Sequence, residues 1–140
     1  RDLISDLQME EAFKAHTNWL HNLPSPYFAK AGSEMIKKME DFTIKGVTIS
    51  ASGFYAPQGR VLRLPLAMPD MVESFESFRY KDYKITNFEM EGSAIAGLSA
   101  LMGHNSATVC CIIANRHFKE SNPNYKPYIM DLIEKSLDRL

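Results

Sequence analysis

Cysteine is scarce in this chain of 140 residues. The sequence contains two, Cys110 and Cys111, and they are adjacent. Neighbouring residues on an extended strand point to opposite faces, so a disulfide between these two would be strained. The sequence therefore argues against a secreted, disulfide-stapled scaffold and favours the cytoplasm. Two cysteines alone do not make a zinc site, and we interpret both as small core residues on a buried strand.

Long apolar runs and an excess of one charge are also absent. No stretch approaches the roughly 20 apolar residues that span a bilayer. The net charge of -1 gives no general attraction to nucleic acid or to an anionic membrane. We therefore expect no membrane or nucleic-acid partner. We also expect no metal, because metal-ligand spacing is missing among the histidines, which are His16, His21, His104 and His117.

Apolar periodicity indicates an alternation of helices and strands. We expect helices over residues 3–20, 31–39, 70–78, 92–102 and 128–140, and strands over 42–51, 83–88 and 106–114. The helix over 92–102 is apolar around most of its circumference, so we expect it to be buried. The segment 106–114 is almost continuously apolar, which is typical of a strand covered on both faces. The pattern predicts one α/β domain with a mostly parallel central sheet flanked by helices.

Polar clusters follow three of the expected strands. They are residues 53–60, 89–91 and 115–116. In open α/β sheets, ligands bind in the crevice at the carboxyl ends of the strands. The sequence therefore predicts a small-molecule site built from these clusters.

Two carboxylates flank a methionine in the second cluster, Glu89-Met90-Glu91. Carboxylates can accept hydrogen bonds from the two hydroxyls of a sugar, while the methionine packs on an apolar ring face. The alternative is a plain helix N-terminus, where acidic residues are favoured by the helix dipole. Metal binding or glycosidase chemistry is weakly supported, because no further Asp or His accompanies the pair.

The first cluster combines an aromatic ring, an amide and a guanidinium. The amide of Gln58 can donate and accept at the same time, which matches the edge of uracil, where an N–H lies between two carbonyls. Arg60 can donate to a further carbonyl, and Phe54 can lie against the base or the sugar. The alternative is an ordinary loop with one exposed arginine.

These motifs resemble the nucleoside phosphorylase family. The resemblance lies in Asn87-Phe88-Glu89-Met90-Glu91 and continues through residues 92–116. Upstream, residues 46–48 and the loop 53–60 resemble the pyrimidine branch of the family, the uridine phosphorylases. The Phe-x-x-x-Gln-x-Arg spacing is kept, although the loop reads Ala56-Pro57-Gln58-Gly59 where Pro-Gly-Gln-Glu is expected. Gly92 also stands where a serine or alanine is usual.

The resemblance implies a nucleoside-phosphorylase-like fold and a pentosyltransferase of nucleoside metabolism and pyrimidine salvage. In this reaction phosphate attacks uridine, and uracil and ribose 1-phosphate are released. Carried over to this sequence, Glu91 and Arg60 are the expected catalytic residues. The expected substrate-binding residues are Phe54 beside the base, Gln58 and Arg60 on uracil, Met90 and Glu91 on ribose, Glu89 beside them, Ile113 as an apolar contact to the base, and Arg116 supporting the base-binding arginine.

Ala114 bears on the choice of base. Purine-specific relatives carry an aspartate at this place, which protonates the purine as it leaves. Alanine cannot be a general acid. Charge on a leaving uracil can instead be stabilised at its carbonyl oxygens by Arg60 and Gln58. The resemblance therefore implies a pyrimidine.

The family's phosphate site is not found in the sequence. Arg1 is the only arginine before Arg60, and no glycine-rich phosphate loop precedes Arg60. Since the chain opens with Arg1 rather than Met, we expect residues 1–140 to be the carboxy-terminal, nucleoside-binding half of a longer enzyme. Phosphate is then a co-substrate bound elsewhere, no cofactor is implied, and the resemblance suggests a homo-oligomer, commonly a hexamer.

Three alternatives to phosphorolysis stay open at this point. The chain could be a catalytically silent nucleoside-binding domain, or part of a nucleosidase that hydrolyses the N-glycosidic bond. The third alternative is an α/β fragment of unrelated function.

Overall fold

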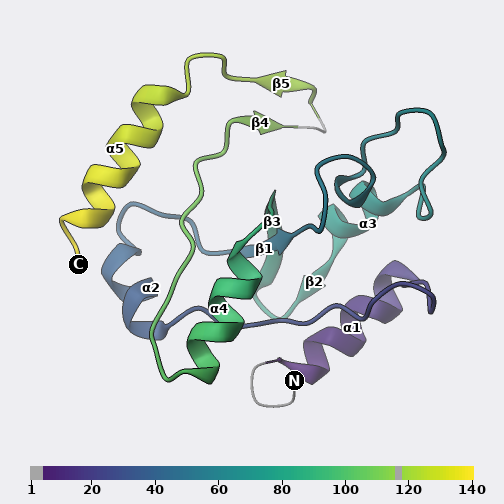
Figure 1. Cartoon of the computed structure of the whole chain (residues 1–140), viewed down its shortest axis with the longest axis horizontal. Coiled ribbons are helices and arrows are strands. Elements are labelled where there is room, and N and C mark those ends of the chain that lie inside the picture. Colours follow the sequence, from purple (N-terminus) through teal and green to yellow (C-terminus); the bar gives the residue numbers. More distant parts are fainter. Residues whose placement is uncertain (1–4, 116–117) are drawn as a thin grey trace.

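Helices and short strands are interspersed along the computed structural model, which describes residues 5–115 and 118–140 (Figure 1). The chain is a mixed α/β protein, as the apolar periodicity predicts. Its elements in order are α1 (Leu7–Thr17), α2 (Ser33–Met39), β1 (Val47–Ser50), the short 3-10 helix η1 (Ala56–Gln58), α3 (Met71–Ser77), β2 (Arg79–Tyr80), β3 (Tyr83–Glu89), α4 (Gly92–Leu101), β4 (Ala114–Asn115), β5 (Glu120–Ser121) and α5 (Lys126–Leu137).

The main sheet has three strands in the order β1-β3-β2. β1 pairs with β3 in parallel, and the register aligns Ser50 with Glu89. β2 pairs with β3 in the antiparallel direction through a tight turn, at which Lys81 has a positive φ of 54°. The short strand β2 was not predicted, and it leaves one parallel and one antiparallel pairing in this sheet.

An aromatic cluster fills the core on one side of the sheet. Phe13 of α1 is its centre, with ring centroids 5.2 Å from both Phe75 of α3 and Phe78. Val47 and Ile49 of β1 pack against this cluster, so one face of the strand is apolar. Helices α1 and α3 lie to the right of the strands in Figure 1, whereas α4 lies to the left. The other buried apolar members are Met9 and Met71.

The opposite face of the sheet carries a row of polar side chains. Successive residues of a strand point to alternate faces. Thr48 and Ser50 therefore point away from the aromatic core. Thr48 donates a hydrogen bond of 2.9 Å to the amide oxygen of Asn87, and Ser50 donates to the carboxylate of Glu89. The alternation of apolar and polar residues in β1 thus separates the core from the candidate site.

Local signals set the ends of α1. Asp6 caps its first turn, because its carboxylate accepts a 3.0 Å hydrogen bond from the backbone N–H of Met9. The helix ends at Asn18, which adopts the left-handed conformation with φ 48°. The helix is therefore shorter than the predicted 3–20, of which residues 3 and 4 lie outside the described part of the chain.

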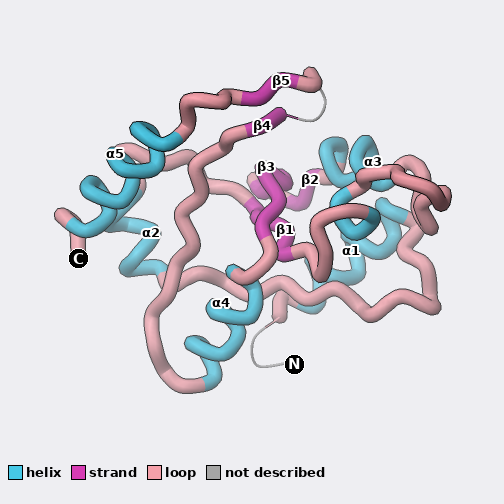
Figure 2. Tube along the Cα trace, turned by 45° about the horizontal axis from the view of Figure 1, so that its top comes forward, coloured by secondary structure: helices cyan, strands magenta, loops and turns pink. Residues whose placement is uncertain are grey.

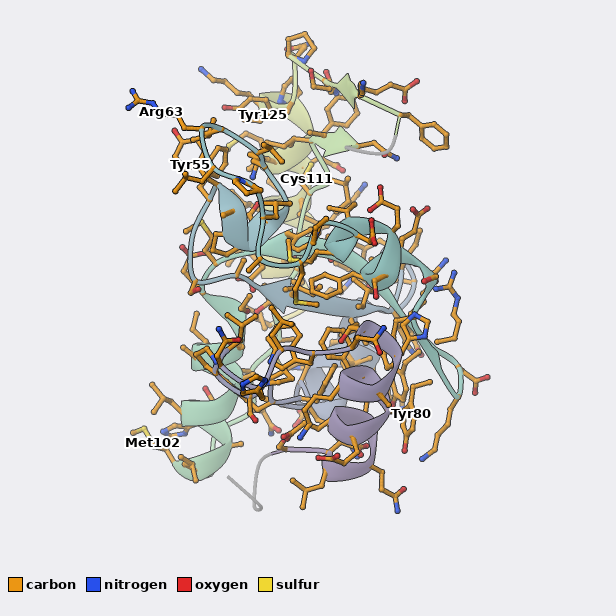
Figure 3. All side chains as sticks on the ribbon, turned by 90° about the vertical axis from the view of Figure 1, so that its right-hand side faces the viewer. Tyr55, Arg63, Tyr80, Met102, Cys111 and Tyr125 are labelled. Carbon is orange, nitrogen blue, oxygen red and sulfur yellow. The ribbon has the colours of Figure 1, made fainter. Side chains whose placement is uncertain are left out.

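The prediction that the helix over 92–102 is buried is wrong. On α4 the side chains of Ile95, Leu98 and Leu101 are between 52% and 61% exposed. Met102, the residue after the helix, lies at the periphery of the molecule (Figure 3). Only small residues of α4 are buried, namely Gly92 and Gly97. The apolar composition favours burial, but the described residues place no element over this side of α4.

The prediction of a covered strand over 106–114 is also wrong. Most of this segment runs as a long irregular connection from α4 to β4 (Figure 2). A strand requires a neighbour that satisfies its backbone groups in a ladder. Here Ser106 instead accepts a 2.7 Å bond from the N–H of Gly32, and Ile113 accepts one of 2.9 Å from Asn122. Only Ala114–Asn115 pair, with β5, and Ile112 and Ile113 are exposed.

The terminal helix α5 is tied to the region after α2. Arg139 donates two hydrogen bonds, of 2.9 Å and 2.6 Å, to the carboxylate of Asp41. Most exposed ion pairs contribute about 1 kcal/mol or less, and the bidentate geometry is the arrangement in which such a pair contributes measurably. No helix in the described ranges is long and apolar enough to cross a membrane.

Candidate functional site

Two polar segments leave the sheet side by side. The parallel register places Ser50 opposite Glu89, and the N–H of Ala51 donates a 2.9 Å hydrogen bond to the carbonyl of Glu89. The loop 51–60 and the turn 89–92 therefore start at the same edge of the sheet. The sequence predicted three polar clusters at this edge, and the register confirms the placement of the first two.

A glycine shapes the loop that follows β1. Gly59 has a positive φ of 75°, which side chains other than that of glycine rarely adopt. Its N–H donates to Ala56, and the N–H of Arg60 donates to the carbonyl of Tyr55 at 3.0 Å. These bonds fold the loop back on itself. As a result, Gln58 and Arg60 are held on either side of a tight turn.

The structure brings together the three side chains that the sequence singled out in this loop. Nη1 of Arg60 donates to the amide oxygen of Gln58 at 2.8 Å and to the carbonyl of Phe54 at 2.5 Å. The guanidinium carbon lies 3.7 Å from the centroid of the Phe54 ring, a cation–π geometry. Gln58 is only 4% exposed, whereas Phe54 is 52% exposed. The cluster thus joins a buried amide to a partly open aromatic face.

The carboxylate of Glu89 is bound inside its own turn. One oxygen accepts hydrogen bonds from the N–H groups of Glu91, at 2.7 Å, and Gly92, at 2.5 Å. The other oxygen accepts from the hydroxyl of Ser50. Partial burial raises the pKa of Glu89, but the hydrogen bonds from Ser50 and from the backbone outweigh burial and hold the pKa below its usual value. The carboxylate is therefore ionised at neutral pH.

Met90 and Glu91 are the exposed members of the turn. Met90 is 42% exposed, and Glu91 is exposed as well. Glu91 occupies the N-cap position of α4, yet its side chain makes no capping hydrogen bond. The alternative interpretation of this cluster was that its acidic side chains stabilise the N-terminus of the helix. This interpretation describes Glu89 better than Glu91.

Gly92 fits a crowded position directly after the turn. A Cβ atom at this residue would lie 2.7 Å from Oγ1 of Thr108 and 3.1 Å from a carboxylate oxygen of Glu89. The usual serine or alanine would force one of these groups to shift. The glycine at this position thus agrees with the close approach of the connection 103–113 to the turn.

Cys110 lies further along the same connection, beside Asn87. Burial raises the pKa of its thiol, the neighbouring Asn87 amide lowers it, and the carboxylate of Glu89 raises it, with a net increase. The thiol is therefore neutral at neutral pH and is a poor nucleophile. Both cysteines are free thiols, and both are partly buried rather than fully buried as predicted.

The third cluster is only partly described. Ile113 and Ala114 are exposed, and Asn115 accepts a 3.2 Å hydrogen bond from the N–H of Phe118. Arg116 lies outside the described residues.

Two serines that the sequence reasoning missed connect the turn to its neighbours. The hydroxyl of Ser50 accepts a 2.7 Å hydrogen bond from the N–H of Ser93. The side chain of Ser93 accepts one of 3.0 Å from the hydroxyl of Tyr27. A polar residue that ends an alternating strand could have pointed to Ser50, but no local signal distinguishes Ser93 or Tyr27.

The described part of the chain contains no group of three or more His, Cys, Asp or Glu residues that could hold a metal ion. What the site offers is a buried amide, a guanidinium, an aromatic face and a free carboxylate at one edge of a sheet. This arrangement is typical of α/β domains in which ligands lie beyond the carboxyl ends of parallel strands.

Comparison with known proteins identifies the family. The Phosphorylase superfamily profile matches residues 4–137, so the chain belongs to this superfamily. A uridine phosphorylase of Thermococcus kodakarensis is 32% identical over 77 residues. This match covers 51% of the chain but 25% of that relative, so the chain matches about a quarter of the relative's length. No solved structure matches the chain. The family match confirms the resemblance seen in the sequence motifs.

Proposed function

We propose that this chain holds the nucleoside in the phosphorolysis of uridine, which yields uracil and ribose 1-phosphate. The observation that carries the proposal is the parallel register of Ser50 and Glu89. Because of this register, a loop suited to a pyrimidine base and a turn suited to ribose start at one edge of the sheet. The similarity to a uridine phosphorylase supports the same substrate.

Base recognition rests on Gln58 and Arg60. In the structure the amide oxygen of Gln58 accepts a hydrogen bond from Arg60, and in the proposed complex this amide offers its acceptor oxygen to the N–H of uracil. The amide nitrogen donates to the adjacent carbonyl of the base. A base that stacks on the same face of Phe54 as the guanidinium displaces Arg60 from that face, and Arg60 then donates to the remaining carbonyl.

Ribose recognition rests on Met90 and Glu91. The exposed carboxylate of Glu91 accepts hydrogen bonds from the sugar hydroxyls, and the thioether of Met90 packs against the sugar ring. Glu91 thereby orients the anomeric carbon for attack by phosphate. A fixed carboxylate near this carbon also stabilises the positive charge that develops on the ribose in the transition state.

The leaving base receives negative charge on its carbonyl oxygens. Arg60, always charged, stabilises this charge by donating hydrogen bonds, so no acid is needed at Ala114. Arg60 and Glu91 are therefore the proposed catalytic residues. Ile113 and Arg116 complete the proposed substrate site as an apolar contact to the base and a support for Arg60, and Arg116 lies outside the described residues.

The remaining expectations belong to the same proposal. Residues 1–140 form one domain, the carboxy-terminal nucleoside-binding half of a nucleoside-phosphorylase-like enzyme, and β1 and β3 are the parallel core of its central sheet. Phosphate is a co-substrate, and no cofactor is required. The enzyme is a cytoplasmic pentosyltransferase and a homo-oligomer, commonly a hexamer.

The test is uracil release from uridine by the natural protein that contains this chain, with and without phosphate. The proposal requires release that depends on phosphate and yields ribose 1-phosphate. Equal release without phosphate would identify a nucleosidase instead. Binding of uridine without any release in either condition would identify a silent binding domain.

A further inference from the structure

We propose that Ser50 and Glu89 are positioning residues, which fix the Met90–Glu91 turn for the ribose without touching the sugar. The inference rests on the proposed function, because it assigns roles within the same site. It divides the two acidic residues of the turn into a structural carboxylate, Glu89, and a substrate-facing one, Glu91.

Three hydrogen bonds hold the carboxylate of Glu89 in place. Its carboxylate accepts from two backbone N–H groups of its own turn and from the hydroxyl of Ser50. Hydrogen bonds to an ionised acceptor are about twice as strong as neutral ones. The three donors hold the carboxylate against the start of α4. Glu91, two residues later, forms no capping bond and is exposed, so it is the carboxylate that can meet a ligand.

The hydroxyl of Ser50 joins three elements of the fold. It donates to Glu89 at the end of β3 and accepts from the N–H of Ser93 in the first turn of α4, while Ser50 itself ends β1. A hydroxyl can donate only one hydrogen bond, and the hydroxyl of Ser50 donates it to the carboxylate of Glu89. Removing this one oxygen therefore loosens the turn from both neighbouring elements at once.

Tyr27 provides a matched control. Its hydroxyl donates a 3.0 Å hydrogen bond to the side chain of Ser93, in the same first turn of α4. The variant Tyr27→Phe removes a hydrogen bond to α4 but leaves the bonds among Ser50, Glu89 and the Ser93 N–H unchanged. This control separates two effects. One is loss of the hydrogen bonds that the Ser50 hydroxyl makes to Glu89 and to the N–H of Ser93, called the Ser50 clamp below, and the other is a general weakening of the first turn of α4.

The experiment measures the dissociation constants of uridine and uracil by calorimetry. Their ratio reports the contribution of the ribose alone. For Ser50→Ala we expect uridine to bind about tenfold more weakly, the loss expected from one hydrogen bond to a charged group, with uracil binding unchanged. Ser50→Thr, which keeps the hydroxyl, and Tyr27→Phe should both keep the wild-type ratio.

Amide hydrogen exchange measures the strength of the Ser50 clamp in the absence of ligand, through the exchange rate of the Ser93 N–H. Ser50→Ala should speed the exchange of the Ser93 N–H, whereas Ser50→Thr should not. Unchanged exchange in Ser50→Ala would overturn the proposed clamp. An unchanged binding ratio, or an equal loss for uridine and uracil, would overturn the positioning role. If the wild-type chain binds neither compound, the proposed function fails first and the inference fails with it.

Discussion

Replacing Gln58 with alanine removes the amide that we propose reads the base. In the structure this side chain is 4% exposed and accepts a 2.8 Å hydrogen bond from Arg60. Arg60 keeps its bond to the carbonyl of Phe54 and its position over the Phe54 ring, so the loop retains two of its contacts. Loss of one hydrogen bond to a charged group should lower the free energy of unfolding by about 1.5–3 kcal/mol.

The effect on uridine follows from the two hydrogen bonds that the amide makes to uracil. Each contributes a net 0.5–1.5 kcal/mol, so the pair contributes about 1–3 kcal/mol. At about 1.4 kcal/mol for each factor of ten, the dissociation constant of uridine should rise about 5- to 150-fold. Adenosine lacks the uracil edge, and its weaker binding should not fall further.

Calorimetry with uridine and adenosine measures both effects, and Gln58→Glu supplies the matched control. A glutamate has nearly the same volume and can still accept from Arg60, but it cannot donate to the base. It should therefore keep the loop folded while losing uridine affinity. If uridine and adenosine affinities fell by the same factor in Gln58→Glu, the amide would not be reading the base.

Three further predictions concern stability. The folded-state pKa of Glu89 lies below its unfolded value, so the stability that the ionised carboxylate contributes is fully present above the unfolded pKa and is lost as the pH falls through the folded pKa. In acid titrations followed by circular dichroism, Glu89→Gln should therefore lack the loss of stability that the wild type shows when Glu89 is protonated. Gly59→Ala should lower the free energy of unfolding by more than about 1–2 kcal/mol, since φ is positive and the new Cβ would lie 2.4 Å from Val72. Gly103→Ala is the control, because its φ is similar and no atom lies within 4 Å of the new Cβ, so it should lower the free energy of unfolding by less. Equal denaturant midpoints for the two variants would show that the clash at Gly59 is relieved. Phe13→Ala should lower the free energy of unfolding by about 3–5 kcal/mol, and a loss below about 1 kcal/mol would contradict its central place in the core.

Local patterns predicted much of the framework. The alternation in Val47-Thr48-Ile49-Ser50 marks a strand with one apolar and one polar face, and the structure places these faces against the core and toward the site. The apolar spacing of α1 and the proline-rich segment after it place the first helix correctly, apart from its ends. Capping at Asp6 and the left-handed Asn18 decided those ends. Such boundaries depend on single hydrogen bonds rather than on periodicity.

Burial was predicted less well than secondary structure type. An apolar segment gains free energy by burial only where other elements cover it, and composition does not specify those partners. The segments 92–102 and 106–114 show this limit, because both are apolar, yet the first is largely exposed and the second is only partly buried. The site also shows a limit of single motifs. Glu89 and Glu91 look equivalent in sequence, but only the fold brings Ser50 to Glu89 and leaves Glu91 open.

Nucleoside binding by the loop and the turn is tested most directly by titrating the 140-residue chain with uridine and following its backbone amide signals by nuclear magnetic resonance. If the loop and the turn form one nucleoside site, signals shift in two separate segments, residues 53–60 and 89–92, at the same uridine concentrations, and shift less with adenosine. Shifts in neither segment, or larger shifts with adenosine than with uridine, would contradict the proposed site.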